Sequence, residues 1–179
     1  MVAGEIERFV SLGLTPIPLV PGTKQPRVEG WTTKPREELL VAFTDGDNVG
    51  LRIEKPIFIV DVDEKKLLDL FLDAMGRTLV VQTRRGYHIY LKTRHYPRNN
   101  KKSQLVQLLA EGCQVVAPPS VVDGHVYRFL DDSAPIAELD ARKTKLVETI
   151  VEAIAKHEDL ILQFVRVWSE GHRHNLSLW

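Results

Sequence analysis

Two aspartates one residue apart, Asp61 and Asp63, have the spacing in this sequence that most directly suggests chemistry. They follow four apolar residues in the stretch IFIVDVDEKK, residues 57–66. Side chains alternate along a strand, so both carboxylates share one face and start from Cα atoms about 6.5 Å apart. Such a pair repels unless a cation lies between its members, and a hard divalent ion such as Mg²⁺ or Mn²⁺ prefers oxygen ligands. The alternative is a plain strand end, with Asp63 capping a helix that starts at Glu64.

A basic block follows in residues 83–102, TRRGYHIYLKTRHYPRNNKK, with seven Lys or Arg, two His and no acid. Its interleaved tyrosines are typical of surfaces that contact phosphates and stack on bases, although a like-charged block is often only a solvated surface. On the expected strand 87–92, His88 shares a face with Lys92. Placed just past an R-R-G turn, His88 could donate to a phosphate, or it could be a half-buried histidine satisfied by the backbone.

A third feature is the stretch CQVVAPPS, residues 113–120. Pro118 and Pro119 cannot continue a strand ladder, so the chain must leave its sheet there. The corner would present Ser120 rigidly to a site, or it could be an ordinary turn between two strands.

Periodic apolar patterns predict the elements that position these residues. We expect helices over residues 3–12, 33–43 and 64–76, and a helical pattern from about residue 134 onward. We expect strands over 15–20 (at a sheet edge, because of its prolines), 48–53, 55–63, 79–83 and 87–92 (a hairpin), 105–110, 113–117 and 126–130. The sequence ends in HRHNLSLW, whose last residues are apolar and uncapped, which predicts an element that continues beyond them.

Bulk composition is that of an ordinary globular protein: 179 residues, 44% apolar and 27% charged. This length suits one substantial core with a small appendage. No apolar run is long enough to span a membrane, and the N-terminus lacks the features of a signal peptide. The single Cys113 excludes an internal disulfide and a Cys-cluster zinc site. We therefore expect a cytoplasmic protein, and its zero net charge gives no general attraction for nucleic acid.

The order of the motifs is more specific than any one of them. A P-G-x-K-x-P loop, N-x-G, an apolar strand ending in D-x-D, R-G-Y-H, E-G-x-Q-V-V-A-P-P-S and Y-R-F succeed one another between about residues 13 and 130. This series resembles the primase-polymerase domain of the archaeo-eukaryotic primase superfamily, the bifunctional type found on plasmids, viruses and integrated elements. The resemblance implies an α+β fold: a mixed-sheet, RRM-like catalytic core with a smaller α/β unit in residues 1–140. Residues 141–179 would then start a helical C-terminal extension.

The resemblance also implies metal-dependent, template-directed nucleotidyl transfer, as in a DNA polymerase or primase. By position, Asp61 and Asp63 would bind catalytic Mg²⁺ or Mn²⁺, and His88 would hold the triphosphate. Further candidates for nucleotide binding are Lys24, Arg84, Arg85 and Ser120. Candidates for contacting the nucleic-acid backbone are Lys92, Arg94, Arg98, Lys101 and Lys102. The implied partners are a DNA template and primer, nucleoside triphosphates and a fused or associated helicase, with no membrane.

The sequence departs from the family pattern at its third acid, which lies five residues before the glycine of E-G. Counted back from Gly112, that position is Gln107. An amide keeps an oxygen that can coordinate but lacks the charge that holds a metal. Three explanations are open: a substitution that impairs catalysis, two aspartates that suffice with substrate phosphates, or a contribution from Glu111.

Two other classes of protein compete with this interpretation. A phosphatase of the haloacid dehalogenase type also uses a strand that ends in D-x-D, but it requires Thr where this chain has Lys65. The second is a nucleic-acid- or nucleotide-binding module on the same fold that has lost catalysis. Gln107 is the feature that favours it.

Overall fold

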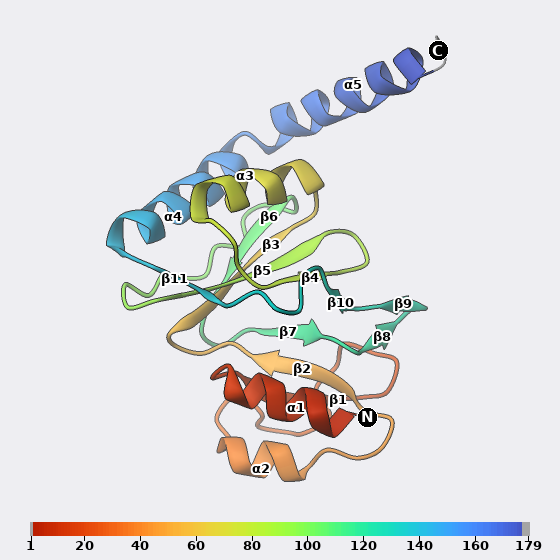
Figure 1. Cartoon of the computed structure of the whole chain (residues 1–179), viewed down its shortest axis with the longest axis vertical. Coiled ribbons are helices and arrows are strands. Elements are labelled where there is room, and N and C mark those ends of the chain that lie inside the picture. Colours follow the sequence, from red (N-terminus) through yellow and green to blue (C-terminus); the bar gives the residue numbers. More distant parts are fainter. Residues whose placement is uncertain (1, 177–179) are drawn as a thin grey trace.

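The computed structural model describes residues 2–176, which form a six-stranded sheet, a three-stranded sheet and a small two-stranded hairpin (Figure 1). The large sheet has the order β10-β4-β5-β3-β6, with β11 beside β5. β11 runs parallel to β5, whereas the other pairs in this order are antiparallel. Its strands are β3 (Ile57–Val62), β4 (Val80–Gln82), β5 (Tyr87–Thr93), β6 (Val106–Leu109), β10 (Arg128–Phe129) and β11 (Ala137–Leu139).

The small sheet contains β1 (Thr15–Leu19), β2 (Asn48–Arg52) and β7 (Gln114–Ala117), in the antiparallel order β1-β2-β7. β1 lies at the edge, as its prolines predict. Helices α1 (Val2–Ser11) and α2 (Arg36–Val41) contact β1. The hairpin of β8 (Val121–Val122) and β9 (His125–Val126) projects beside β7 (Figure 1).

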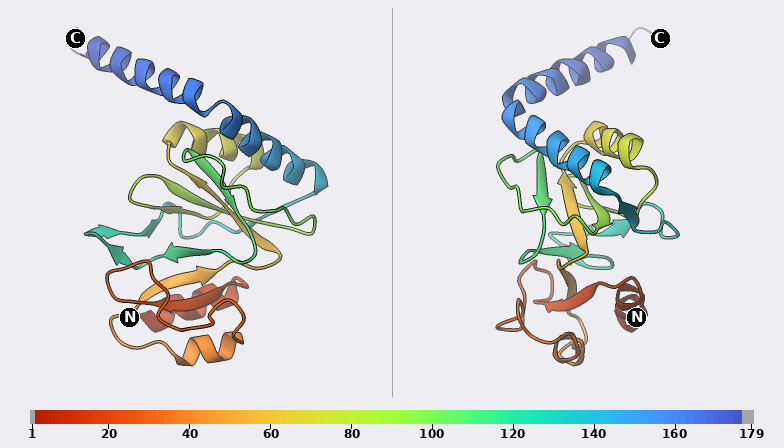
Figure 2. Two further views of the ribbon diagram at one scale, coloured as in Figure 1. Left: turned by 180° about the vertical axis from the view of Figure 1, so that it is seen from behind. Right: turned by 90° about the vertical axis from the view of Figure 1, so that its left-hand side faces the viewer.

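Two helices cover the outer face of the large sheet, away from the small sheet (Figures 1 and 2). They are α3 (Lys65–Met75) and α4 (Ala141–Lys156), and α5 (Glu158–Leu176) extends away from the body. None of the helices in residues 2–176 is long and apolar enough to cross a membrane.

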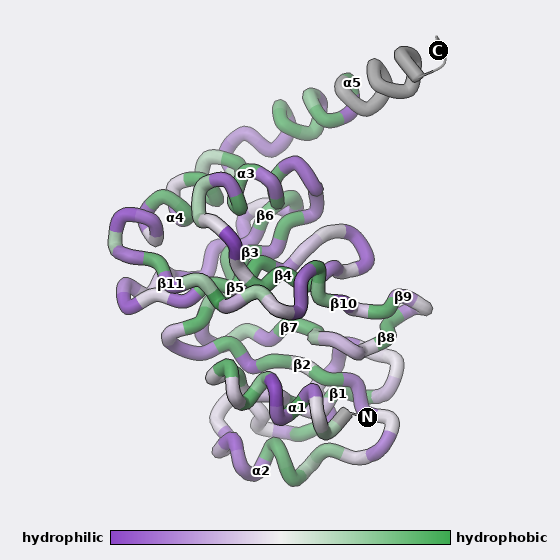
Figure 3. The backbone as a smooth tube through the Cα atoms, viewed as in Figure 1, coloured by the Kyte–Doolittle hydropathy of each residue, from purple (hydrophilic) through white to green (hydrophobic). Residues whose placement is uncertain are grey.

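The alternation of β3 separates two hydrophobic cores. Phe58, Val60 and Val62 pack in the core beneath α3 and α4. Ile57 and Ile59 point the other way, into the core that the large sheet shares with the small sheet. Figure 3 shows hydrophobic residues running along β2 and β7, which close this second core. Since side chains alternate, the residue after Val60 must emerge on the face toward the small sheet.

These elements confirm the predicted α+β class. Strands β3 to β6 pair antiparallel in the order β4-β5-β3-β6, and α3 follows β3 along the chain. The parallel strand β11 makes this core a mixed sheet, which lies beside the smaller unit. The predicted boundary at residue 140 falls between β11 and α4, but α4 buries Val147, Val151 and Ile154 in the core of the large sheet. The division into domains of residues 1–140 and 141–179 stays a prediction.

Two expectations of secondary structure were wrong. The helical pattern assigned from residue 134 includes β11, which pairs with residues 91–93 of β5. β4 is short and reaches only residues 87–89 of β5, so the rest of that edge has free hydrogen-bonding groups, and β11 satisfies them. The strand expected over residues 126–130 is divided into β9 and β10, with Tyr127 between them.

Candidate active site

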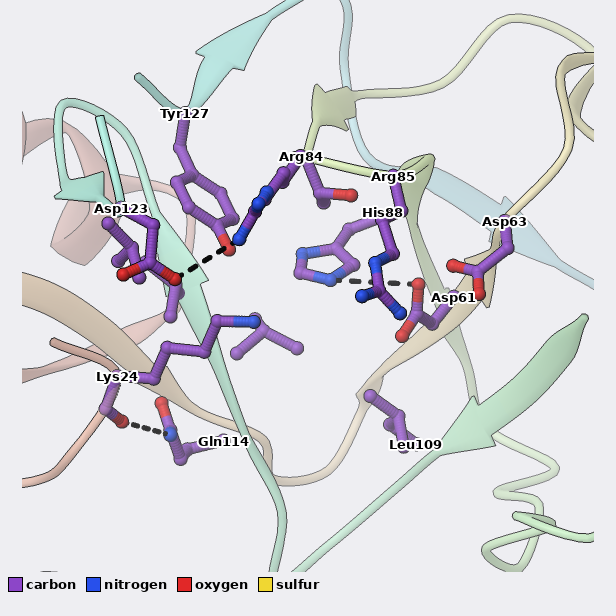
Figure 4. A pocket seen from close by; sticks show the side chains of 14 residues that line it. Lys24, Asp61, Asp63, Arg84, Arg85, His88, Leu109, Gln114, Asp123 and Tyr127 are labelled. Atoms are coloured by element: carbon purple, nitrogen blue, oxygen red, sulfur yellow. Dashed lines mark hydrogen bonds and ion pairs between the residues drawn. The ribbon is translucent and has the colours of Figure 1, made fainter. Parts of the chain in front are cut away.

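A cavity of about 480 Å³ lies between the large sheet on one side and β7 with the β8–β9 hairpin on the other (Figure 4). The large sheet and its β4–β5 turn contribute Asp61, Asp63, Thr83, Arg84, Arg85, His88 and Leu109. The opposite wall consists of Lys24, Gln114, Val115, Val116, Val122, Asp123 and Tyr127. Chain segments about a hundred residues apart therefore meet at one place.

Asp61 occupies the centre of the large-sheet wall. β3 lies between β5 and β6, so Asp61 stands opposite His88 on one neighbour and opposite Gln107 on the other. Residues directly opposed in a ladder share a face. His88 Nε2 is 3.8 Å from Asp61 Oδ1, which is too long for a hydrogen bond and leaves this nitrogen available to another acceptor.

Asp63 continues the same face beyond the end of β3. Its backbone N–H donates to Leu105 O at 2.9 Å, which keeps the chain extended there. The residue at the N-cap of α3 is Glu64, and no side chain caps that helix. The alternative role of Asp63 as a helix cap therefore does not apply, and its carboxylate lines the cavity with Asp61.

The surroundings of the two carboxylates disfavour their ionised forms. Burial raises the pKa of Asp61 to about 6, although Lys24 acts against this shift. Burial and the neighbouring Asp61 raise the pKa of Asp63, and Arg85 and Lys24 oppose them. The basic groups present thus compensate these carboxylates only in part, and a bound cation would complete the compensation.

His88 is buried and neutral at physiological pH. Burial, with a contribution from Lys24, lowers the pKa of His88 to about 4. A neutral imidazole carries one N–H donor. Its Nδ1 is buried and makes no hydrogen bond to any described residue. The ring therefore has donor capacity that the protein itself does not use.

The donor set fits a hard divalent cation. The described residues include no group of three or more His, Cys, Asp or Glu able to hold a metal. Asp61 and Asp63 supply two carboxylates, and Mg²⁺ typically needs only one or two together with waters and substrate phosphates. At the third-acid position, Gln107 Nε2 donates to Ser103 O at 3.1 Å, so part of its amide is already engaged.

Basic side chains face the carboxylates. Figure 4 shows Lys24 reaching toward the cavity from the side opposite Asp61 and Asp63. The backbone oxygen of Lys24 accepts a hydrogen bond from Gln114 Nε2 at 2.9 Å. Arg84 reaches across the cavity, and its Nη1 lies 3.2 Å from Asp123 Oδ2 on the hairpin.

The turn that carries the arginines is pressed against the end of β3. A Cβ at Gly86 would lie 1.9 Å from Val62 O and 2.7 Å from Asp63 Cα. Thr83 closes the turn, because its N–H donates to Gly86 O at 2.8 Å. Only glycine permits this approach, which brings the arginines close to Asp63.

Three residues predicted to bind metal or nucleotide do not line the cavity: Gln107, Ser120 and Glu111. Ser120 is buried, and its hydroxyl accepts from Val49 N at 2.8 Å and donates to Val49 O at 3.1 Å. It anchors the proline corner to β2 and does not line the cavity. Glu111 lines a separate depression with Arg98 and Tyr96, at the far end of β6 from Asp63.

The basic residues predicted to contact nucleic acid lie outside the cavity. Lys92 is at the opposite end of β5 from His88. Arg94 is exposed, with its Nε 3.9 Å from Glu138 Oε1. Lys101 and Lys102 are exposed in the loop before β6.

Sequence reasoning missed several lining residues, among them Gln114, Asp123 and Tyr127. Gln114 and Tyr127 belong to the quoted motifs Q-V-V-A and Y-R-F, which was the available signal, but no role was attached to them. Tyr127 lies beside His88, with ring centroids 6.4 Å apart. Asp123 belongs to none of the quoted motifs.

Acidic groups suited to a cation and basic groups suited to anions thus face each other across one cavity. The fold and the site together define an α+β domain suited to a ligand that carries phosphates. A model of the family "Bifunctional DNA primase/polymerase, N-terminal" matches residues 7–142, and the chain belongs to this family. The resemblance indicated by the motifs is confirmed. The family consists of nucleotidyltransferases of the primase/polymerase type, which generally depend on a divalent metal. A search of curated proteins found no match to this chain.

Proposed function

We propose that this chain catalyses template-directed nucleotidyl transfer as a DNA polymerase or primase, in the replication of a plasmid, virus or integrated element. The observation that carries this proposal is the convergence of Asp61, Asp63 and His88 on one cavity in a chain of this family. Asp61 and Asp63 would hold Mg²⁺ or Mn²⁺. DNA and nucleoside triphosphates are the partners this activity requires.

In the proposed reaction, a 3′-hydroxyl oxygen bonds to the α-phosphorus of a nucleoside triphosphate. The bond to the bridging oxygen breaks, pyrophosphate leaves, and the hydroxyl proton passes to water. Divalent ions in such a site lower the pKa of the attacking hydroxyl and neutralise charge on the attacking and leaving oxygens. The protein residues perform positioning and electrostatic work, as is usual for phosphoryl transfer.

The residues around the carboxylates divide this work. His88 would donate from Nε2 to a phosphate oxygen, since this nitrogen is 3.8 Å from Asp61 Oδ1 and makes no hydrogen bond with it. Lys24, Arg84 and Arg85 would orient the β- and γ-phosphates, because they line the same cavity. Together, the contacts from His88 and from these basic residues would hold the α-phosphorus in line for attack.

The basic residues outside the cavity suit the template strand. Lys92, Arg94, Arg98, Lys101 and Lys102 would contact phosphates without reading bases, since synthesis must accept any sequence. We also propose that a fused or associated helicase acts together with this chain. The proposed location is the cytoplasm, where such DNA replicates.

The direct test is extension of a primed DNA template with Mg²⁺ or Mn²⁺. Asp61→Asn and Asp63→Asn keep side-chain shape and remove charge, so each should lower extension by about 100-fold or more. Asp69→Asn is the matched control, because Asp69 lies exposed on α3 with Lys65 as its partner. Extension at the wild-type rate by both cavity variants would refute the assigned role.

One observation favours a second candidate, a binding module without catalysis: Gln107 lies opposite Asp61 where the family has its third acid. If the wild-type chain binds primed DNA but does not extend it, Gln107→Glu should restore extension. Extension by the wild-type chain would dismiss this candidate. The phosphatase alternative fits less well, because Lys65 points to solvent and pairs with Asp69.

A further inference from the structure

The asparagine of the N-x-G motif, Asn48, has no role in the proposed mechanism and yet connects two segments of the cavity wall that faces the large sheet. It is the first residue of β2 and is buried. Its Nδ2 donates to Thr23 O at 3.0 Å and to Val121 O at 2.9 Å. Its Oδ1 accepts from Val121 N at 3.2 Å. Both amide donors are thus used, each on a different segment of backbone.

Each of these segments carries a cavity residue close by. Thr23 directly precedes Lys24, whose side chain lines the cavity. Val121 lies two residues before Asp123, the ion-pair partner of Arg84. One side-chain amide therefore fixes the backbone beside Lys24 relative to the hairpin that faces Arg84.

The loop that carries Lys24 contains no helix or strand. Its position in the cavity wall therefore depends on hydrogen bonds to other segments of the chain. The loop runs from β1 to α2 and is folded onto itself by hydrogen bonds on either side of Lys24. Thr23 N donates to Val20 O at 3.0 Å, Val20 N donates to Gln25 O at 2.8 Å, and Gln25 N donates to Thr23 Oγ1 at 3.1 Å. Gln114 Nε2 holds Lys24 O, and Thr23 Oγ1 donates to Val20 O at 2.9 Å within the loop itself. A lysine has a long, flexible stem, so anchoring its backbone lowers the entropy lost when its ammonium meets a phosphate.

We propose that Asn48 is a positioning residue that sets the affinity of the cavity for a nucleoside triphosphate by holding Lys24 in place. The inference rests on the proposed function, because it assigns Lys24 to the triphosphate. Asn48 itself does not line the cavity. Its effect on binding therefore passes through Lys24.

A double-mutant cycle tests this dependence in the full chain, with dATP and ATP, each with Mg²⁺, as probes. Asn48→Ala should raise the Kd of the triphosphate about tenfold, by releasing the loop. In a Lys24→Ala background the same change should add less than about twofold, since coupled residues are not additive. Once the triphosphate is saturating, kcat should change much less than KM.

Thr78→Ala is the matched control for lost stability. Thr78 is buried, and its hydroxyl donates to Tyr90 O at 2.5 Å and accepts from Ala137 N at 2.9 Å, away from the cavity. This variant should unfold at a lower denaturant concentration than the wild type and bind the triphosphate normally. If Asn48→Ala does not fold, Asn48→Ser replaces it, because the shorter hydroxyl cannot reach both Thr23 and Val121.

Amide hydrogen exchange separates this inference from the proposed function. Exchange in residues 20–25 should rise in the Asn48 variant and stay unchanged in Thr78→Ala. Normal triphosphate affinity in Asn48→Ala, or full additivity with Lys24→Ala, would overturn the inference while the proposed function stands. A wild-type chain that binds neither triphosphate would refute the proposed function, and unchanged exchange in residues 20–25 would independently refute the positioning role.

Discussion

At the scale of single residues, the site depends on two polar side chains, Asp61, which is partly buried, and His88, which is buried. The rest of the protein only partly offsets the burial of the Asp61 charge and leaves hydrogen-bonding capacity of His88 unused. The pKa of Asp61 is raised by burial to about 6, and His88 is buried with an unused nitrogen. Such arrangements cost stability and are typical of functional sites. This is the arrangement expected if, as we propose, Asp61 binds a cation and His88 donates to a phosphate.

Replacing His88 should affect nucleotide binding more than folding. His88→Ala removes the donor that we assign to the triphosphate, so KM for the nucleotide should rise about tenfold or more, in line with loss of a hydrogen bond to a charged group. Steady-state extension at varied triphosphate concentration measures this effect. His95→Ala is the control, because His95 is exposed in the loop after β5. An unchanged KM would contradict the assignment of His88 to triphosphate binding.

Gly86 is the residue at which a single methyl group should disturb the site. The added Cβ would overlap Val62 O, so Gly86→Ala must move the arginine turn away from β3. We expect a loss of about 1–3 kcal/mol in the free energy of unfolding, together with reduced extension. Urea unfolding measures the first effect.

Gly4→Ala is the corresponding control. Gly4 lies in α1 with no atom within 4 Å of an added Cβ. It should leave extension unchanged and stabilise the chain by up to about 1 kcal/mol, since alanine favours helix. Equal effects of the two substitutions would contradict the close approach at Gly86.

At the scale of elements, the loop that carries Lys24 is held against β2 by ionic as well as neutral hydrogen bonds. Arg27 Nη2 lies 2.6 Å from Asp47 Oδ2, and Thr44 N donates to the same carboxylate at 2.8 Å. Burial raises the pKa of Asp47, but the hydrogen bonds from Arg27 and Thr44 outweigh burial and hold this pKa below its ordinary value. The loop is therefore a fixed wall of the cavity rather than a free segment.

This pairing predicts a pH-dependent contribution to stability. The pKa of Asp47 is lower in the folded state than in the unfolded state, where it is about 4. Ionised Asp47 therefore contributes to the free energy of unfolding above about pH 4, and this contribution is lost as the pH falls through the lower pKa of the folded state. Asp47→Asn should lower the free energy of unfolding by about 1–3 kcal/mol at pH 7. The difference from wild type should shrink below about pH 4 in denaturant titrations. A difference that does not vary with pH would argue against the ionic contact.

At the scale of the whole molecule, the net charge is zero, but the basic side chains are unevenly distributed. Arg84 and Arg85 of the basic block line the cavity, whereas its exposed basic residues beyond β5 lie outside the cavity, in the loop between β5 and β6. Template binding and nucleotide binding should therefore be separable by mutation.

Lys101→Ala combined with Lys102→Ala tests this separation. If both lysines contact phosphates, the slope of log K against log salt for single-stranded DNA should fall by up to about 1.4, at about 0.7 per contact. The Kd of the triphosphate should not change. Lys145→Ala on the exposed side of α4 is the control and should leave the slope unaltered. An equal loss of triphosphate binding would contradict the separation.

The sequence by itself determined what depends on neighbours along the chain. Alternation in β3 places Asp61 on the face opposite Val60 and Val62, and the structure has this arrangement. The order of the motifs indicated the family that the family model confirms. Both signals are local in the sequence, because strand periodicity and turn residues act over a few positions.

Only the tertiary structure decided which distant segments meet. It brought Lys24 and Tyr127 to Asp61, turned Ser120 toward Val49, and placed Glu111 in another depression. It also made residues 137–139 a strand, because an unpaired stretch of β5 required a partner. The physical reason is the same in each case: the packing of one sheet against another, and the satisfaction of backbone hydrogen bonds between them, depend on residues far apart in the chain.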